Sequence, residues 1–425
     1  NEEMMQKYEM QLSTGKKIQT PSDDPIVAVR ALKFRTNVRE ISQYKTNSED
    51  ANSWLSVNEQ AMNNSLDLLQ RARELSVQGS SDIYSTEDRA NITAELTQIK
   101  TQIFNEANVN YAGRFVFAGF KTDQPVVFTK DMPDTYEITE HIGASDISTV
   151  QKVIGENVID VPRYRLGYSG VSESAAPLVP SNIPAPYTLV TTDSSGTGLL
   201  PGDSAYQPPA DTIYFLEDTG EMIFNQDNVD GTVPAAAFPA NIDFTYEKGG
   251  LSKGDLNPQM YFESINQTTG NAYIPPNDKM VYQISYNQEI DVNTNAKDIF
   301  TVDMYRDFEE VLNSIENIPT DGSIQQSLEE DILGDVFENM MTKLDDHLNT
   351  VVIKEAEVGS RVNRLNLTIA RLEDDKINFT DLLSINEDAD MTEATLNLRA
   401  QEIVYTASLQ SSTQIMQQSL LDFLR

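Results

Sequence analysis

Cysteine is absent from this chain of 425 residues, and histidine occurs only twice, as His141 and His347. Without cysteine there is no disulfide, no thiolate nucleophile and no cysteine metal site. Histidine serves much general acid–base chemistry and many metal sites, and these two lie far apart in the sequence. The composition therefore counts against an enzyme, and we expect no catalytic residue, no cofactor and no metal site.

Basic residues are also scarce, with 31 Lys and Arg against 66 Asp and Glu, which gives a formal net charge of −35. A surface of this charge repels nucleic acid and anionic lipid and keeps a concentrated protein in solution. No run of about 18 apolar residues is present, and no cleavable signal peptide is recognisable. We therefore expect no nucleic-acid partner and no membrane insertion.

Proline and glycine are nearly missing from both ends of the chain. Fifteen of the 18 prolines and 13 of the 20 glycines lie between residues 121 and 300. This favours an α+β fold, in which both ends form an elongated, discontinuous bundle of long, coiled-coil-like helices and a β-rich outer region is inserted between them. We assign 1–120 and 297–389 to the helical rod, 121–296 to one or two inserted domains, and 390–425 to a terminal helix.

The N-terminal end predicts two helices joined by a short connection. Gly15 follows a helical pattern at a place where a helix end is expected. Asp24 can accept hydrogen bonds from the free amides of the next helix, and Pro25 fits its first position because a missing N–H costs nothing there. Asp23 and Asp24 could also be paired catalytic carboxylates, but a cap and a loop contact explain both. No Gly or Pro then interrupts the chain before Gly79, which predicts one continuous helix.

Trp54 is the single tryptophan, and it shares an apolar stripe with Leu68 and Leu75 of this long helix. Such spacing places the three side chains on one helix face. Core packing accounts for Trp54, and a contact with another subunit is the alternative. A further helix is predicted from Thr86, with the capping residues at Thr86 to Asp88.

The C-terminal end repeats the helical pattern, with one short helix before Pro319, a stripe from Leu328 to Val351 and a heptad run from Val358 to Leu383. His347 lies on the first stripe, where a packed or half-exposed side chain is expected. The last helix should begin after Asp390, which resembles the start of a capping box. Its apolar stripe, interleaved with glutamines, can stay unfolded until a partner covers it; it comprises Leu396, Ala400, Ile403, Ala407, Leu420 and Leu424.

Between the two ends the apolar period changes to that of strands. Residues 212–216 and 221–224 flank Asp218-Thr219-Gly220, which predicts a hairpin. Residues 242–246 and 281–286 alternate like half-buried strands, and the Pro-rich stretches 177–186 and 201–209 predict loops. The sequence from Asp227 to Gly231 resembles a calcium loop, but its ligand spacing and distal Glu are wrong, and a turn is favoured.

Several motifs together resemble the bacterial flagellin family. The resemblance covers about residues 1–120 and 280–425, and leaves 130–275 without a match. Within the family, the PSDDP and NYAG forms are similar to the subfamily found at the junction of hook and filament. The motifs are LSTGKKI at 12–18, PSDDP at 21–25, NVNYAGRFVFAG at 108–119, VGSRVNRL at 358–365, SINEDADM at 384–391 and QQSLLDFL at 417–424.

The resemblance implies a structural, non-enzymatic subunit of the bacterial flagellum, extracellular and exported through the flagellar type III apparatus. The implied partners are neighbouring copies of itself in a ring, the first hook-associated protein on the hook side, flagellin on the filament side, and an export chaperone for the C-terminal helix. The resemblance also implies that the first part of the N-terminal inner helix is missing from this chain. We therefore expect 390–425 to be less ordered than 25–76, or to be held by another contact.

Two other functions stay open at this point. A filament flagellin would share the same helical ends, and the inserted region could act as an adhesin. The residues that we expect to carry assembly are Asp23, Asp24, Pro25, Trp54, Leu396, Ile403, Leu420 and Leu424.

Overall fold

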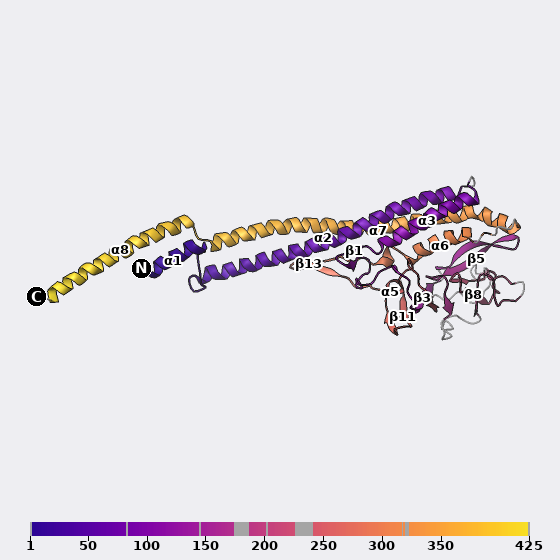
Figure 1. The fold of residues 1–425 in the computed structure, drawn as a ribbon, viewed down its shortest axis with the longest axis horizontal. Coiled ribbons are helices and arrows are strands. Elements are labelled where there is room, and N and C mark those ends of the chain that lie inside the picture. Colours follow the sequence, from indigo (N-terminus) through magenta and orange to yellow (C-terminus); the bar gives the residue numbers. More distant parts are fainter. Residues whose placement is uncertain are drawn as a thin grey trace. The chain divides into compact units, whose positions relative to one another are not determined.

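The computed structural model describes residues 2–81, 84–143, 146–173, 187–200, 203–225, 241–316, 318 and 323–423 (Figure 1). The predicted loop at 177–186 and the calcium-like sequence at 227–231 lie outside these residues, and so does Leu424. The side chain of Leu420 is likewise outside the described part.

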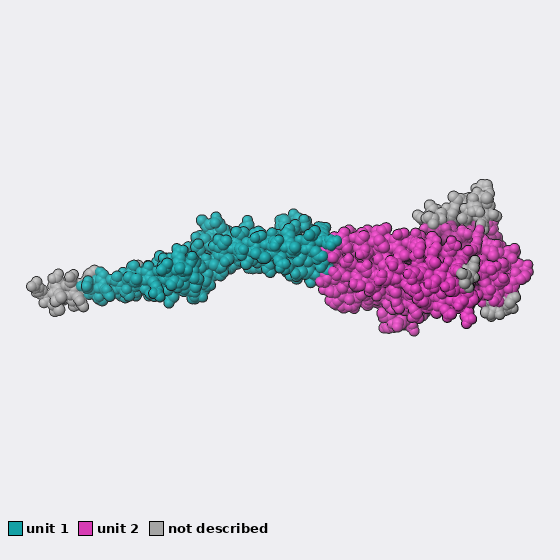
Figure 2. Space-filling view, turned by 90° about the horizontal axis from the view of Figure 1, so that it is seen from above, with its two compact units in different colours: residues 1–52, 282–290, 363–425 teal, residues 53–281, 291–362 magenta. Residues whose placement is uncertain are grey.

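The chain divides into two compact units (Figure 2). Unit 1 comprises residues 1–52, 282–290 and 363–425, and unit 2 comprises residues 53–281 and 291–362. The α+β class is confirmed, because long helices form both ends of the chain and strands fill its middle. The domain boundaries drawn from the sequence follow that change of composition and stay a prediction.

The helices of both ends are long because no proline interrupts them. The predicted single helix after Pro25 is confirmed and spans 55 residues. The two C-terminal stripes, predicted separately, belong to one helix of 64 residues. The helices are α1 (Glu2–Thr14), α2 (Pro25–Gly79), α3 (Thr86–Glu106), α5 (Pro258–Tyr261), α6 (Val302–Glu316), α7 (Ile324–Glu387) and α8 (Met391–Phe423), with a 3-10 turn η2 at Ala296–Asp298.

Helix starts follow the capping chemistry of the sequence, with one correction. Asp24 Oδ1 accepts hydrogen bonds from the amides of Ile26 at 3.0 Å and Val27 at 3.1 Å. The predicted cap of α3 at Thr86 is wrong by one residue, because Ser85 accepts from the Asp88 amide and Asp88 accepts from the Ser85 amide. This reciprocal box satisfies two amides that the helix leaves free, and so it fixes the start at Thr86.

Replacing Asp24 by alanine is expected to lower the free energy of unfolding by about 1 kcal/mol, because two amides of the first turn of α2 lose their acceptor. Urea denaturation followed by far-UV circular dichroism measures the change. Asp24→Asn is the matched control, since its side-chain oxygen still caps the helix, and it should cost only a few tenths of that amount. An equal loss in both variants would contradict a capping role.

The middle of the chain forms two five-stranded sheets. One has the order β12-β11-β3-β10-β6 and the other β4-β5-β9-β8-β7, while β1-β2 and β13-β14 form separate two-stranded sheets. The predicted hairpin is confirmed as β8 paired with β9. The strands are β1 (Asn110–Tyr111), β2 (Arg114–Phe115), β3 (Tyr136–Gly143), β4 (Ser148–Ile154), β5 (Asn157–Arg165), β6 (Ser172–Glu173), β7 (Thr188–Thr192), β8 (Thr212–Leu216), β9 (Glu221–Ile223), β10 (Asn241–Lys248), β11 (Glu263–Asn266), β12 (Asn271–Tyr273), β13 (Val281–Ser285) and β14 (Gln288–Asp291).

The two five-stranded sheets share a core. Phe215 of β8 packs edge-on against Phe244 of β10 with ring centroids 5.0 Å apart, and both rings are buried. Edge-on packing of this kind adds to the free energy gained by burying the rings. Because each ring belongs to a different sheet, the β-rich region of unit 2 is held together by side chains from both.

In unit 1, α2 contacts the later part of α7 through one aromatic pair and one ion pair. Ala28, Ala31 and Ala51 of α2 are buried, and small side chains let a neighbouring helix approach closely. Phe34 and Phe379 bring their rings to 6.5 Å, and Lys45 pairs with Glu373 at 3.2 Å.

Candidate assembly site

The connection between α1 and α2 is built from the predicted residues Asp23, Asp24 and Pro25. Asp23 Oδ2 accepts hydrogen bonds from the amides of Gln19 and Thr20, both at 2.8 Å. These amides lower the pKa of Asp23, because they stabilise its charged form. The two carboxylates thus have separate structural tasks, one in the loop and one at the helix start.

This connection is bonded to the one between α7 and α8, and we call the contact the terminal joint (Lys16, Lys17 and Arg35 with Glu387, Asp388 and Ala389). The Lys17 amide donates to the Glu387 carbonyl at 2.7 Å, and the Ala389 amide donates to the Gly15 carbonyl at 2.9 Å. Gly15 has a φ of +68°, a conformation that other residues rarely adopt, and so it ends α1 and frees its carbonyl for this bond.

Side chains add charge pairs to the terminal joint. The Glu387 carboxylate, whose side chain is only 3% exposed, contacts Lys16 Nζ at 3.1 Å and Arg35 Nε at 3.0 Å. Lys16 also reaches Asp388 at 2.6 Å. Burial alone would raise the pKa of Glu387, but the hydrogen bonds from Arg35 and Lys16 outweigh it and lower this pKa. The bond from Lys16 lowers the pKa of Asp388 as well.

Glu387→Gln is expected to lower the free energy of unfolding by about 1 kcal/mol at pH 7. The loss is modest because Lys16 and Arg35 are 42% and 47% exposed, so that water screens the pairs. A carboxyl group whose pKa is lowered by folding stabilises the folded state at any pH above its ordinary pKa. It loses this contribution as the pH falls through the lowered pKa. The difference from the native chain should therefore shrink below about pH 4.5.

The measurement is urea denaturation followed by circular dichroism between neutral and acid pH. The control is Glu402→Gln on α8, an exposed residue of the same unit, which should change the free energy by less than about 0.5 kcal/mol. A difference between Glu387→Gln and the native chain that stayed constant down to acid pH would show that the lost charge is not the cause.

Helix α8 has one covered face and one uncovered face. It packs against α1 in its first part, where Ala394 is buried and Leu398 and Tyr405 are half-buried. On α1 the half-buried residues include Met5, Tyr8 and Leu12, the apolar residues expected from the helical spacing. Thus α1 contacts the last helix over its first turns, while the lower order expected for 390–425 relative to 25–76 stays a prediction.

The apolar stripe predicted for α8 lies on the uncovered face. Leu396 is 65% exposed and Ile403 is 69% exposed, and Val404 is exposed beside them. Within this chain the stripe is therefore not an inward-facing one. Its role in assembly stays a prediction. The exposure of three large apolar side chains on one side of α8 names the residues that would carry this role.

Trp54 lies in unit 2 and is 4% exposed, with its ring edge-on to Tyr111 at 6.0 Å between centroids. Tyr111 belongs to the tyrosine-bearing segment noted in the sequence. Trp54 therefore packs in the core of unit 2, as the first of its two interpretations expected. Its use in assembly stays a prediction.

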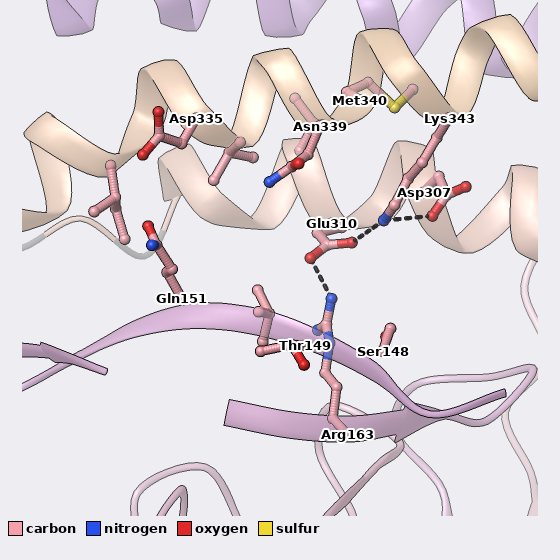
Figure 3. A pocket seen from close by; sticks show the side chains of 14 residues that line it. Ser148, Thr149, Gln151, Arg163, Asp307, Glu310, Asp335, Asn339, Met340 and Lys343 are labelled. Carbon is pink, nitrogen blue, oxygen red and sulfur yellow. Dashed lines mark hydrogen bonds and ion pairs between the residues drawn. The ribbon is translucent and has the colours of Figure 1, made fainter. Parts of the chain in front are cut away.

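A buried ionic network joins β5 of the inserted region to α6 and α7 (Figure 3). Arg163 of β5 pairs with Glu310 of α6, and Lys343 of α7 reaches both Glu310 and Asp307 at 2.9 Å. Arg165 Nη2 contacts Asp307 at 2.5 Å, and His347 Nε2 lies 2.8 Å from the other Asp307 oxygen. Asp307 thus meets charged or polar partners from two neighbouring elements.

The carboxylates of the network stay charged despite their burial. Burial acts to raise the pKa of Asp307, but His347, Arg165 and Lys343 overcome it and lower this pKa. Glu310 behaves alike, because Arg163, Lys343 and Arg165 lower its pKa against the effect of burial. Both carboxylates are therefore ionised across the neutral pH range, and removal of either charge would leave its buried cationic partners uncompensated.

Sequence reasoning missed this network, although its spacings carried a signal. Arg163 and Arg165 are two apart on a strand and so point to one face. Lys343 and His347 are four apart on a helix and share a side. However, no feature of the neighbouring sequence indicates that this strand packs against these helices.

Among the described residues no group of acidic and histidine side chains is arranged to hold a metal ion. No helix in the described ranges has the length and apolar character that a membrane span needs.

Both ends of the chain match models of known protein families. Residues 1–122 match the family model of the bacterial flagellin N-terminal helical region. Residues 341–424 match that of the bacterial flagellin C-terminal helical region. Both matches fall on the segments where the sequence motifs were found.

Similar curated proteins include flagellar hook-associated protein 3 of Escherichia coli (strain K12), 35% identical over 118 residues, which are 28% of this chain and 37% of that protein. The flagellar filament 31.3 kDa core protein of Treponema maltophilum is 31% identical over 175 residues, 39% of this chain and 57% of that protein. The chain thus covers between about a third and somewhat over half the length of these two relatives.

Solved structures of related name also align with most of the chain. A putative flagellar hook-associated protein from Vibrio parahaemolyticus covers 86% of this chain and is itself covered over 99%, at 14% identity and a TM-score of 0.44. The flagellar junction protein FlgL from Legionella pneumophila covers 85% of it and is covered over 100%, at 15% identity and a TM-score of 0.37.

Proposed function

We propose that this chain, whose ends match the family models of the bacterial flagellin N-terminal and C-terminal helical regions, is a structural subunit of the bacterial flagellum at the junction of hook and filament. The task is mechanical and not catalytic. Each subunit would contribute long helices that pack against those of its neighbours, in a heterologous contact that repeats around a ring.

The observation that carries this proposal is the uncovered face of α8. Leu396, Ile403 and Val404 expose large apolar side chains on a helix whose opposite face is already covered by α1. Burying one such side chain stabilises a contact by roughly 1.5–3 kcal/mol, so a neighbour that covers all three gains a substantial free energy. The face therefore suits a helix of another subunit.

The proposed partners follow from the place in the assembly. They are neighbouring copies of this chain, the first hook-associated protein on the hook side and flagellin on the filament side. An export chaperone would cover the apolar stripe of α8 before assembly, during export through the flagellar type III apparatus. The assembled protein would then lie outside the cell, in the flagellum.

The test is deletion of the gene. We expect cells that build hooks, lack filaments and release unpolymerised flagellin into the medium. The alternative is a filament flagellin, which the similarity to a filament core protein of Treponema maltophilum favours. Cells without the gene that lack filaments but secrete no other flagellin would establish that alternative.

A point variant tests the α8 face itself. Ile403→Asp should leave the purified chain folded, because Ile403 is 69% exposed, yet fail to restore filaments in the deletion strain. Ser412→Asp introduces the same charge at an exposed position on the opposite side of α8 from Ile403, and it should restore them. If Ile403→Asp also restored filaments, the uncovered stripe would not be the assembly surface.

A further inference from the structure

Strand β4 lies at the edge of its sheet and leaves main-chain hydrogen-bonding groups unused. In the order β4-β5-β9-β8-β7 it is paired on one side only. Thr149 of β4 lies opposite Pro162 of β5, whose carbonyl accepts a hydrogen bond from the Phe224 amide after β9, at 2.9 Å. Opposite residues of an antiparallel pair either bond each other or both point away. The N–H and C=O groups of Thr149, and of Gln151 two residues on, therefore point away from β5.

A groove runs along this free edge, between β4 and α7 (Figure 3). Two cavities form it, one of about 110 Å³ lined by residues 148–151 of β4 and one of about 570 Å³ lined by residues 150–155. Side chains of successive strand residues point to opposite faces, so a cavity that all of them line lies beside the edge of the strand. Thr149 and Gln151 are exposed, and no residue in the described ranges bonds their outer main-chain groups.

Helix α7 forms the opposite wall of the groove with a single face. Its lining residues recur at spacings of three and four, which places them on one side of the helix. Ile332 and Val336 are half-buried there and give the wall an apolar centre. The edge of a second sheet brought against β4 would meet α7, whereas one extended chain needs only about 4.8 Å of width. The lining residues of α7 are Ile332, Asp335, Val336, Asn339, Met340 and Lys343.

The charges left over in the groove favour a basic occupant. Asp335 is exposed, and in Figure 3 no ion pair joins it to another lining residue. Burial raises the pKa of Glu329 although Lys152 acts against this, so a further cation nearby would favour the charged form. The other basic lining residues are already paired with carboxylates of the walls; they are Arg163, Arg165, Arg306 and Lys343.

We propose that this groove binds one extended segment of a partner protein, which adds to β4 as a further strand and carries apolar residues together with Lys or Arg. Its main chain would exchange hydrogen bonds with Thr149 and Gln151. Its apolar side chains would cover Ile332 and Val336, and a basic side chain would reach Asp335. In strand addition of this kind the main-chain bonds supply affinity and the side chains supply specificity.

This inference does not rest on the proposed place of the protein in the flagellum. The groove lies wholly within unit 2, and neither α8 nor the terminal joint lines it. A negative result in the experiment below would therefore leave the proposed function untouched, and failure of the gene deletion test would leave the groove untouched.

The experiment is fluorescence anisotropy of a labelled, end-blocked peptide with the full chain at physiological ionic strength. The peptide alternates Val and Lys over about eight residues, the length of a strand. We expect a Kd of about 100 μM or tighter. The matched control peptide carries N-methyl groups on its central residues, which keep the charge and block both strand edges. It should bind at least about tenfold more weakly, although a chain of net charge −35 attracts any basic peptide.

Gln151→Pro tests the location of the peptide. Proline removes the outward N–H and is tolerated on an edge strand, because that N–H bonds nothing in the sheet. We expect binding to weaken about tenfold, since one bond is lost and the ring lies in the path of the added strand. Gln151→Val keeps the N–H and should leave Kd within about twofold of the native value. Asp335→Asn should weaken binding about two- to fivefold.

Three results would overturn the proposal. One is that the alternating peptide does not bind the folded chain. Another is that the N-methylated peptide binds equally well, which would show that the acidic surface alone attracts it. The last is an unchanged Kd for Gln151→Pro, with a far-UV circular dichroism spectrum like that of the native chain, which would place the peptide elsewhere. The N-methylated peptide is tested on the native chain, so this comparison decides the matter even if Gln151→Pro does not fold.

Discussion

Asp307→Asn is expected to lower the free energy of unfolding by about 3–5 kcal/mol at neutral pH. Asparagine keeps the size of the side chain but removes the charge that Arg165, Lys343 and His347 surround. The Asp307 side chain is only 4% exposed, so water cannot replace it as a partner. Removing one member of a buried pair leaves the other charges uncompensated, which is the costly way to break such a network.

The single tryptophan gives a convenient measurement for this variant. Trp54 is buried in the same unit, and its fluorescence should report urea unfolding of that unit. The matched control is Asp346→Asn, an exposed residue on α7, with an expected change below about 0.5 kcal/mol. Equal changes in both variants would show that the network contributes no more than a surface charge.

The pH dependence of the free energy of unfolding gives a second test of the Asp307→Asn prediction. The pKa of Asp307 is lowered in the folded state, because its partners overcome the effect of burial. Its contribution is therefore complete above the ordinary pKa of an aspartate, near 4, and is lost as the pH falls toward the lowered value. The gap between the native chain and Asp307→Asn should stay constant from pH 8 to about 5 and close only in stronger acid.

Backbone amides in 390–425 are expected to exchange with solvent far faster than those in 25–76. The largest difference, about a thousandfold or more, should separate residues after Tyr405 from the buried stretch of α2 around Leu55 and Met62. The physical reason is burial: the described side chains of α8 beyond Tyr405 are all exposed, whereas Leu55 and Met62 are fully buried. An isolated helix with no packing partner is marginal in water.

Hydrogen exchange with mass spectrometry measures both segments in one experiment. The turns of α8 that face α1, from Ala394 to Tyr405, provide an internal control and should show intermediate protection. Equal protection along the whole of α8 and α2 would mean that another contact holds the C-terminal helix. A second copy of the chain would be the first occupant to test, by repeating the measurement at several protein concentrations.

The long helices at both ends of the chain could be predicted from the sequence, because the signals that define them lie in neighbouring residues. The absence of proline between Pro25 and Gly79 and the capping role of Asp24 each depend on neighbouring residues. The hairpin of β8 and β9 could also be predicted from the sequence, since its turn is short. The contact of α1 with the first turns of α8 could not be predicted. Both faces of α8 carry apolar residues, and the sequence does not show which face α1 covers.

The inserted region was predictable only as β-rich. Its central pairing joins β3 at 136–143 to β10 at 241–248, and about a hundred residues separate the partners. Glu140 shows a second limit of prediction from the sequence. It is buried at the centre of this pairing, where Tyr164 donates to it at 2.9 Å and the Gly167 amide at 2.8 Å, and burial raises its pKa. A glutamate in an alternating strand is ordinarily expected on the outer face.

The terminal joint has a consequence for how unit 1 carries load. The Ala389 amide is bonded to Gly15, and Glu387 is held by Arg35 of α2 as well as by its own chain. We therefore expect a torque applied to α8 to reach α2 as well as α7, because two main-chain bonds and a cluster of charges act beside the covalent connection of α8 to α7. Since these bonds also join α1 to α8, a bend of either terminal helix should displace the base of the other.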